Sequence, residues 1–393
     1  MSATLLTAPT HGGFTFGHLV ANVLAGSWRR EPPALTINSE ELARVEPLLT
    51  SSGAAGLAWN RASRTAHLTS APETANLRAM YRHLALQATM NEGSIRFLSE
   101  RLALNGLEPL IFKGWASAQH YALPHLRPFG DIDICVQPGR HAEARELLQR
   151  HVIPGVNNLV NGPFVLDCGP AGKLCQIDLH AGLDQFHLPS LDTLFARSQR
   201  IACGDRAIRI LSHEDHLRLV AMHFLRHGGY RPLWLCDVAA MLETVPGDFD
   251  WDICFGKDPR YAHWLACVFE LARRLLGARI EGLPQAYHVD TLPDWFMRTA
   301  LNEWQVPYLS RMKQPWSYWA AKPWIIPSQL KARWPNPISA TFKSGGNFGR
   351  KSRLLYQLAF LGAAIVTAVS NRLCAAIHSI AGRRRHLPKE AVS

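Results

Sequence analysis

The strongest constraint on the fold is a short alternation of acidic and apolar residues near the middle of the chain. Asp131-Ile132-Asp133-Ile134 is followed by the apolar residues 135 and 136. An alternation with a period of two predicts a β-strand, because successive side chains of a strand point to opposite faces. Asp131 and Asp133 therefore leave the same face of this strand.

Two carboxylates held this close repel each other unless one takes a proton or a cation lies between them. Oxygen ligands of this kind suit Mg²⁺ or Mn²⁺, which bind carboxylates together with substrate phosphates. Two later strands are predicted around residues 164–168 and 174–180, separated by a turn at Gly169-Pro170-Ala171-Gly172. Asp178 lies on the second of them, between the apolar residues Ile177 and Leu179. If this strand is adjacent to the 131–136 strand, Asp131, Asp133 and Asp178 form a three-acid cluster that can hold two metal ions for a phosphoryl displacement.

Cationic residues and a glycine turn precede these acids. Leu110-Ile111-Phe112 predicts a buried strand, and Lys113-Gly114 predicts a turn at its end. A glycine turn lets backbone N–H groups approach a phosphate. Lys113 and Arg127 are candidates to offset triphosphate charge; the alternative is that each is a surface charge.

Three histidines are further candidates. His180 is two residues after Asp178 and so shares its face of the strand. It is either a proton shuttle or phosphate contact, or a hydrogen-bonded structural residue. His223 and His227 are four residues apart on one predicted helical face. This pair either lines the cleft opposite the sheet or binds a transition metal, although no HExxH motif accompanies it.

Several short motifs occur in an order that resembles one family. They are Phe112-Lys113-Gly114, Arg127-Pro128-Phe129-Gly130-Asp131-Ile132-Asp133-Ile134, Gln176-Ile177-Asp178-Leu179-His180, Leu211-Ser212-His213-Glu214-Asp215, His223 with His227, Trp234-Leu235-Cys236-Asp237 and Asp250-Trp251. Over residues 75–285 the chain resembles the uncharacterised nucleotidyltransferase family of the DNA-polymerase-β-like superfamily. It differs from the superfamily in having Lys-Gly-Trp in place of a Gly-Gly or Gly-Ser loop.

The resemblance implies a fold, a reaction and roles for the acids. Asp131 and Asp133 would bind both metals, and Asp178 would bind the catalytic metal and help to deprotonate the acceptor hydroxyl. Gly114 would contact the triphosphate. The reaction would be attack on the α-phosphate of an NTP, with transfer of NMP and release of pyrophosphate. ATP is the expected nucleotide, and Mg²⁺ or Mn²⁺ the expected cofactor.

The expected fold is α+β, with a small mixed sheet, flanking helices and a C-terminal helical domain. The chain of 393 residues has room for two domains. A helical or irregular region is expected over 1–74, the nucleotidyltransferase core over 75–205, and the helical domain over 206–300. Residues 301–393 form an aromatic and proline-rich segment with a basic, apolar C-terminal helix. Further helices are predicted over 75–104, 213–227, 233–244 and 260–276.

Charge is concentrated at the C-terminus. From Ala340 onward the chain has nine basic residues and one acid, so this segment supplies most of the formal net charge of +11. The 18 uncharged residues 354–371 are at the lower limit for a membrane span. We rank a helix docked on its own protein first, peripheral contact with an anionic membrane second, and a span last. The eight cysteines lack metal-ligand spacing, and no secretory signal is evident. We therefore expect a cytoplasmic protein with reduced cysteines, with peripheral membrane association as the second alternative.

The acceptor stays open, because the acids define only the metal end of the site. A small molecule, a peptide, a saccharide or a protein hydroxyl would fit. Nucleic acid is a disfavoured partner, since the basic charge lies in the tail rather than around the core. The alternatives are a glycosyltransferase that uses the two aspartates to hold a metal, and a non-catalytic nucleotide-binding or scaffold protein with the same fold.

Overall fold

The computed structural model describes residues 15–151, 164–167, 174–307, 326, 333–349, 352–364 and 366. The chain divides by its internal contacts into two compact units, residues 1–312 and 313–393, and each is described by itself. The predicted turn at Gly169–Gly172 and the C-terminal part of the stretch 354–371 lie outside the described residues. The four-segment division made from the sequence stays a prediction.

The first unit contains a mixed six-stranded sheet with the order β3-β4-β2-β1-β6-β5. Its strands are β1 (Leu110–Phe112), β2 (Asp131–Cys135), β3 (Phe164–Asp167), β4 (Leu174–Leu179), β5 (Gln199–Cys203) and β6 (Arg206–Ile210). β2 is antiparallel to β1 and parallel to β4. β1 is parallel to β6. The α+β class and the mixed sheet are confirmed. β5 and β6 were not predicted.

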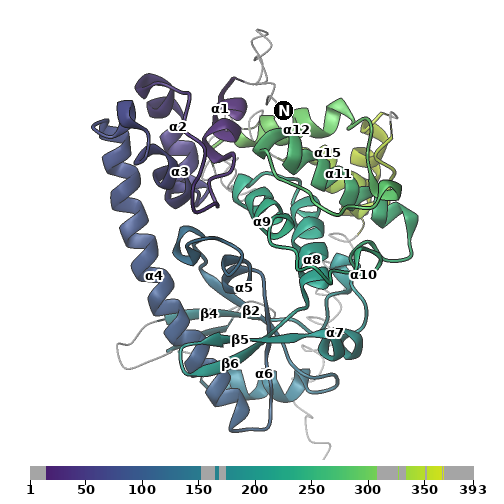
Figure 1. The fold of residues 1–393 in the computed structure, drawn as a ribbon. Helices are drawn as coiled ribbons and strands as arrows, with labels where there is room; N and C mark the ends of the chain where they lie inside the picture. Colours follow the sequence, from purple (N-terminus) through teal and green to yellow (C-terminus); the bar gives the residue numbers. More distant parts are fainter. Residues whose placement is uncertain are drawn as a thin grey trace, which may run out of the picture. The chain divides into compact units, whose positions relative to one another are not determined.

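Helices flank this sheet (Figure 1). The described helices of the first unit are α1 (Thr15–Leu24), α2 (Ser39–Ser51), α3 (Ala55–Ala62), α4 (Pro72–Ala103), α5 (Gly114–Ala118), α6 (His141–Gln149), α7 (Leu191–Arg197), α8 (His213–Arg226), α9 (Pro232–Leu242), α10 (Trp251–Phe255), α11 (Pro259–Leu276) and α12 (Asp294–Trp304). The helix predicted over 75–104 corresponds to α4, and those over 213–227, 233–244 and 260–276 correspond to α8, α9 and α11.

Local sequence signals set several of these boundaries. Pro72 begins α4, where its missing N–H costs no helical hydrogen bond. The Ser212 side chain accepts a hydrogen bond from the backbone N–H of Asp215 and caps the start of α8. Gly277 ends α11 in the left-handed conformation, at φ +64°. These ends fix the helices that carry the site.

One hydrophobic core joins the sheet to the helices beside it. α4 contributes Ile95, Leu98 and Leu102, and the strands contribute Ile132, Ile134, Ile177 and Ile208, among others. The isoleucines of β2 therefore face the core, and its aspartates leave the opposite face of the strand. Burying each large apolar side chain stabilises the fold by about 1.5–3 kcal/mol, and this holds the acid-bearing strand in register.

The described part of the second unit is helical. α15 (Pro337–Lys343) is capped by Asn336, whose side chain accepts from the N–H groups of Ile338 and Ser339. Residues 354–364 form another helical segment. Within this unit Arg353 donates to the carbonyl of Asn347 (2.7 Å). Across the part of the chain that the structure describes, no helix is both long and apolar enough to cross a membrane.

Most described cysteines match the expectation of buried thiols. Cys135, Cys203, Cys236, Cys254 and Cys267 are free and buried. Cys175 on β4 is disulfide-bonded, so the expectation of reduced cysteines is wrong for this residue.

Candidate functional site

Two parallel strands place the first carboxylates side by side. β2 pairs with β4 so that Asp133 lies opposite Asp178, and Asp131 lies opposite Gln176. Neighbouring strands are about 4.8 Å apart, and facing residues project to the same side of the sheet. The register of this one strand pair therefore brings together acids that are 45 positions apart in the sequence.

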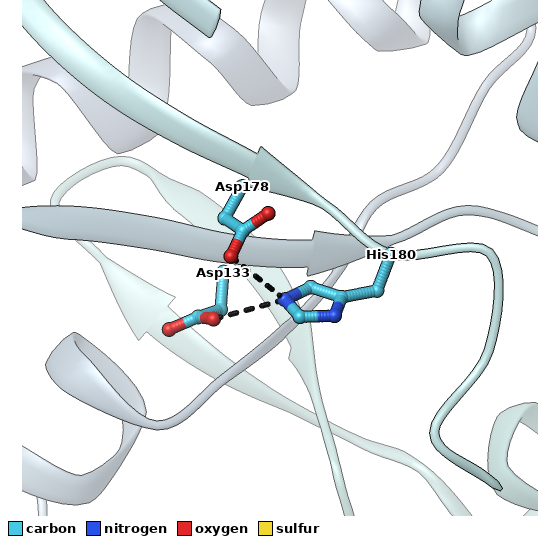
Figure 2. A group of neighbouring side chains, drawn as sticks. All are labelled: Asp133, Asp178 and His180. Carbon is cyan, nitrogen blue, oxygen red and sulfur yellow. Dashed lines mark hydrogen bonds and ion pairs between the residues drawn. The ribbon is translucent and has the colours of Figure 1, made fainter. Parts of the chain in front are cut away.

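His180 joins these two acids, as Figure 2 shows. Its Nε2 atom lies 3.1 Å from Oδ1 of Asp133 and 3.3 Å from Oδ2 of Asp178. One ligand atom from each of the three residues lies within 4.8 Å of the others. Two carboxylate oxygens and one imidazole nitrogen are a donor set that suits a divalent cation. The sequence prediction that His180 shares the acidic face agrees with this position.

Asp131 lies on β2 two residues before Asp133, outside this group. Its side chain is exposed, and the metal-ligand group found among the described residues consists of Asp133, Asp178 and His180 without it. Asp131 and Asp133 both line an adjoining cavity of about 310 Å³. The three predicted acids thus occupy two places: Asp133 and Asp178 in the cluster, and Asp131 at the cavity beside it.

Lys113 connects the turn after β1 to the acid cluster. Its Nζ atom lies 2.7 Å from Oδ1 of Asp133. Its backbone has φ +54°, a left-handed value that is costly for a residue with a Cβ atom. The backbone N–H of Lys113 donates to Nε2 of the buried His216 (3.2 Å), which holds this conformation. At Gly114, with φ +26°, a Cβ atom would lie 3.2 Å from Cβ of Phe129, so this position favours glycine.

Burial and neighbouring charges shift the pKa values of the cluster. Burial raises the pKa of Asp133, but the Lys113 ammonium and the hydrogen bond from His180 outweigh it, and the pKa lies below its ordinary value. Partial removal from water and the nearby Asp133 carboxylate raise the pKa of Asp131. Burial lowers the pKa of His180, but its hydrogen bonds to Asp133 and Asp178 raise it above the ordinary value. The cluster thus favours a charged Asp133 facing cationic groups.

The adjoining cavity combines the acids with cationic and aromatic side chains. α4, the turn after β1, residues 127–131, α8 and the start of α9 form its walls, with Lys113, His223, Arg231 and Trp234 among the lining residues. Its size suits a small ligand or part of one. This combination of acids with basic and aromatic groups can hold a metal-bound phosphate and a planar ring.

Arg127 lines this cavity and also forms a buried ion pair with Asp237. Its Nε donates to Oδ1 of Asp237 (3.0 Å), and its Nη2 donates to Oδ2 (2.7 Å). The hydroxyl of the buried Tyr121 donates to the same carboxylate (2.7 Å). Burial lowers the pKa of Arg127, but Asp237 outweighs it and raises the pKa above its ordinary value. The charge of Arg127 is therefore already balanced by Asp237, 110 residues away in the chain.

His223 on α8 and His227, which follows the end of this helix, lie with their rings 4.5 Å apart but differ in exposure. His223 lines the cavity, and its Nε2 atom is buried without a hydrogen-bond partner among the described residues. Its ring stacks with Phe186 (5.9 Å between centroids) and meets Trp234 edge-on (4.5 Å). Burial holds the pKa of His223 well below its ordinary value. His227 also contacts Trp234 (5.2 Å) but is exposed. Within the described ranges, no third metal-ligating residue completes a site with this pair.

A cluster of three histidines beneath the Lys113 turn was not found from the sequence. His216 accepts from the N–H of Lys113, and its ring lies 6.0 Å from that of His120. His120 in turn contacts His213 (4.5 Å) and pairs through Nδ1 with Oγ1 of Thr244 (2.9 Å). His213 stood inside a recognised motif, but nothing in the local pattern indicated that it would meet His120. The sequence separation of His216 from Lys113, 103 residues, explains the omission.

We expect this cluster to make stability depend on pH. Burial and the neighbouring His213 lower the pKa of His120 to about 3, and burial holds the pKa of His216 well below its ordinary value. Below pH 6.5 the unfolded chain binds protons that the folded cluster excludes, so the free energy of unfolding falls as the pH falls. The slope contributed by one such histidine is at most about 1.4 kcal/mol per pH unit. Urea unfolding between pH 7 and pH 5 measures this dependence.

A matched pair of variants tests the assignment to this cluster. His120→Asn keeps a partner for Thr244 and removes the titrating ring, so its stability is expected to fall less with acidification than that of the wild type. His151→Asn, at an exposed position after α6, is expected to keep the wild-type slope. Equal slopes for His120→Asn and the wild type would contradict the prediction.

Comparisons with known proteins identify a family for the larger part of the chain. Residues 38–277 match the model of a family described as an uncharacterised nucleotidyltransferase. The match begins before residue 75 and so includes α2 and α3. Among solved structures, an antigenic nucleotidyltransferase-like protein from Paracoccidioides brasiliensis is similar, with 16% identity and a TM-score of 0.37. The likeness covers 48% of this chain and 94% of that chain. No curated protein matches significantly.

The family match spans more than half of the chain and contains β1, β2, β4, the acid cluster and α8 and α9. This protein belongs to the family of uncharacterised nucleotidyltransferases.

Proposed function

We propose that the protein transfers NMP from an NTP to an acceptor hydroxyl at Asp131, Asp133 and Asp178. In this reaction the acceptor oxygen forms a bond to the α-phosphorus. The bond from that phosphorus to the oxygen that bridges to the β-phosphate breaks, and pyrophosphate leaves. The observation that carries the proposal is the β2–β4 register, which sets Asp133 beside Asp178 next to a cavity lined by Lys113.

The donor atoms fit Mg²⁺ or Mn²⁺ as the cofactor. Asp133, Asp178 and, from the cavity side, Asp131 would hold the metal, and carboxylate oxygens are the ligands that these ions prefer. When bound, such ions offset the negative charge that develops on the phosphate oxygens. His180 contacts Asp133 and Asp178, and we assign it to orienting these carboxylates or contacting phosphate.

Lys113 and Gly114 are the proposed phosphate contacts. Gly114 begins α5 beside the acids, and its positive φ together with the close approach of Phe129 favours glycine there. The ammonium group of Lys113 pairs with Asp133. Once a substrate binds, this group can pair with a phosphate oxygen instead. We assign Arg127 to shaping the cavity wall, because Asp237 binds one edge of its guanidinium through Nε and Nη2, and Nη1 donates to the carbonyl of Pro128. His223 and His227 would face the rest of the nucleotide.

Asp178 is the proposed acceptor of the hydroxyl proton. Its side chain is 46% exposed, against 5% for Asp133, so an acceptor can approach it. A carboxylate at hydrogen-bond distance from the hydroxyl serves as a general base. ATP is the proposed nucleotide, and a small molecule, a peptide, a saccharide or a protein the proposed acceptor. Peripheral membrane contact of the basic C-terminal segment is also proposed, and sedimentation with anionic liposomes tests it.

Transfer from α-radiolabelled NTPs tests the function directly. We expect the full-length protein, with Mg²⁺ or Mn²⁺ and an extract of the source cells as acceptor, to label a product. Chelation of the metal is expected to abolish the labelling. Testing the four NTPs separately identifies the nucleotide, and fractionating the labelled product identifies the acceptor. The absence of label, together with the absence of metal-dependent NTP binding in calorimetry, would favour a non-catalytic binding protein instead.

We expect Lys113 to compete with a cation for Asp133, because Nζ of Lys113 lies 2.7 Å from the same carboxylate oxygen that contacts His180. Lys113→Met should therefore raise the affinity for Mn²⁺ without nucleotide, by about tenfold for each 1.4 kcal/mol of lost competition. It should also weaken the binding of ATP. Calorimetry with Mn²⁺ and with ATP measures both.

Lys257→Met is the matched control, because Lys257 is exposed and far from the acids in sequence. It should leave both affinities unchanged. A weaker affinity of Lys113→Met for Mn²⁺ would show that Lys113 supports the metal site rather than competing with it.

A further inference from the structure

A second cavity lies at the opposite end of β1 from the acid cluster. Its volume is about 520 Å³, and it is lined by the end of α4, residues 106–109, β6 and Arg200 of β5. Lys113 follows β1 directly, whereas Glu108 and Pro109 precede it. At about 3.3 Å per residue, the strand holds Glu108 and Lys113 roughly 16 Å apart. This cavity is therefore separate from the proposed nucleotide site.

The cavity exists because β1 starts late. β1 pairs with β6 only at Leu110 and Ile111, which face Arg209 and Ile210. Pro109 has no N–H group and cannot extend this ladder. The preceding Gly106 turns at φ +69° with no atom within 4 Å of an added Cβ. The first residues of β6, which pair with β5 on one side, therefore border an opening on the side of β1.

Arginine side chains give this opening an excess of positive charge. Arg200 and Arg209 face each other across β5 and β6, and like charges in that position repel. Both bind the single carboxylate of Glu108, Arg209 at 3.0 Å. Arg206 pairs with Glu100 (3.0 Å), but about half of each of these two side chains is exposed. One carboxylate shared by two guanidinium groups leaves a positive charge available to an anion.

Two buried polar atoms at this cavity lack partners among the described residues. They are Nε of Arg209 and Oγ of Ser99. Ser99 is 8% exposed, and both residues line the cavity. The other nitrogens of Arg209 are engaged: Nη1 donates to Oγ of Ser198 (2.6 Å), and Nη2 binds Glu108. Both atoms are closed off from solvent, so the groups that a ligand in the cavity can reach are the exposed parts of Arg200 and Arg206.

We infer that this cavity binds a small phosphate-bearing molecule, separately from the NTP at the acid cluster. Guanidinium groups recognise phosphate through paired hydrogen bonds. Leu107 and Ile208 provide an apolar wall for the rest of the molecule. The volume lies within the range of small-molecule sites. The inference does not rest on the proposed transfer reaction.

Calorimetry with AMP and with inorganic phosphate tests the inference. Lys113→Met is used as the background, and a chelator removes divalent metals, so that phosphate contact at the acid cluster is suppressed. We expect one saturable site that binds AMP more tightly than phosphate. Arg200→Gln/Arg206→Gln should weaken the binding of AMP by about tenfold or more.

Arg150→Gln is the matched control, because Arg150 also forms an exposed arginine–glutamate pair, with Glu146. It should bind AMP as the background protein does. Absence of saturable binding of both probes would overturn the inference. Binding that Arg200→Gln/Arg206→Gln leaves unchanged would overturn it as well. Failure of nucleotidyl transfer alone would leave this result unaffected, because no turnover is measured.

Discussion

Asp133→Asn is expected to reduce metal-dependent nucleotidyl transfer by about a thousandfold or more. Asp133 is 4% exposed, and its Oδ1 contacts both Lys113 and His180. Asparagine keeps the size of the side chain and an acceptor oxygen but removes the negative charge. The charge is what would hold a divalent cation beside the phosphates. Initial rates with labelled NTP, and Mn²⁺ affinity by calorimetry, measure the two losses separately.

Asp205→Asn is the matched control for this substitution. Asp205 lies in the turn between β5 and β6, is largely exposed, and has only a distant pair with Arg96 (3.8 Å). It should retain wild-type transfer. Thermal unfolding of both variants checks that the fold is preserved. Wild-type rates in Asp133→Asn would remove the acid cluster from the proposed mechanism.

Arg127→Met is expected to lower the free energy of unfolding by about 3–5 kcal/mol. It would leave the carboxylate of Asp237 buried, with Tyr121 as its remaining partner in the described network. An uncompensated buried charge is far more costly than the loss of an exposed ion pair. Urea unfolding at neutral pH measures the effect. Arg127→Met/Asp237→Leu removes both charges and should be less destabilised than Arg127→Met alone.

Arg150→Gln serves as a control here as well. Both side chains of the Arg150–Glu146 pair are about two-thirds exposed, so its loss should change the free energy of unfolding by less than about 1 kcal/mol. If Arg127→Met were as stable as Arg150→Gln, the buried pair would not contribute to the stability of the cavity wall.

Local patterns were sufficient to predict four strands, β1 to β4, and most of the helical part. β1 is a short apolar run, and β2 and β4 carry acids between isoleucines, leucines or other apolar residues. Each pattern depends only on neighbours in the chain. β5 and β6 were missed because their arginines obscure the alternation, with Arg200 and Arg209 on facing positions. Gly204-Asp205 between the two runs was a turn signal that could have revealed this hairpin.

Long-range contacts account for the parts of the site that the sequence did not reveal. The pairing of Asp133 with Asp178 was expected if the strands were adjacent, and their register fulfils that condition. Arg127 pairs with Asp237, and the N–H of Lys113 donates to His216. Each contact joins residues more than 100 positions apart. No spacing rule connects such pairs. The position of His180 between two carboxylates needed the strand register as well.

The parallel pairing of β2 and β4 has a consequence for how this family can diversify. Asp133 and Asp178 sit on core strands, whereas α4, residues 127–131, α8 and α9 form the cavity walls. Helix surfaces and loops can exchange side chains without shifting a hydrogen-bonded ladder. Under the proposed function, the acceptor or nucleotide can therefore change through substitutions of wall residues, while the acid cluster stays the same. For redesign, the sheet is the part to leave alone and the helical walls are the part to vary.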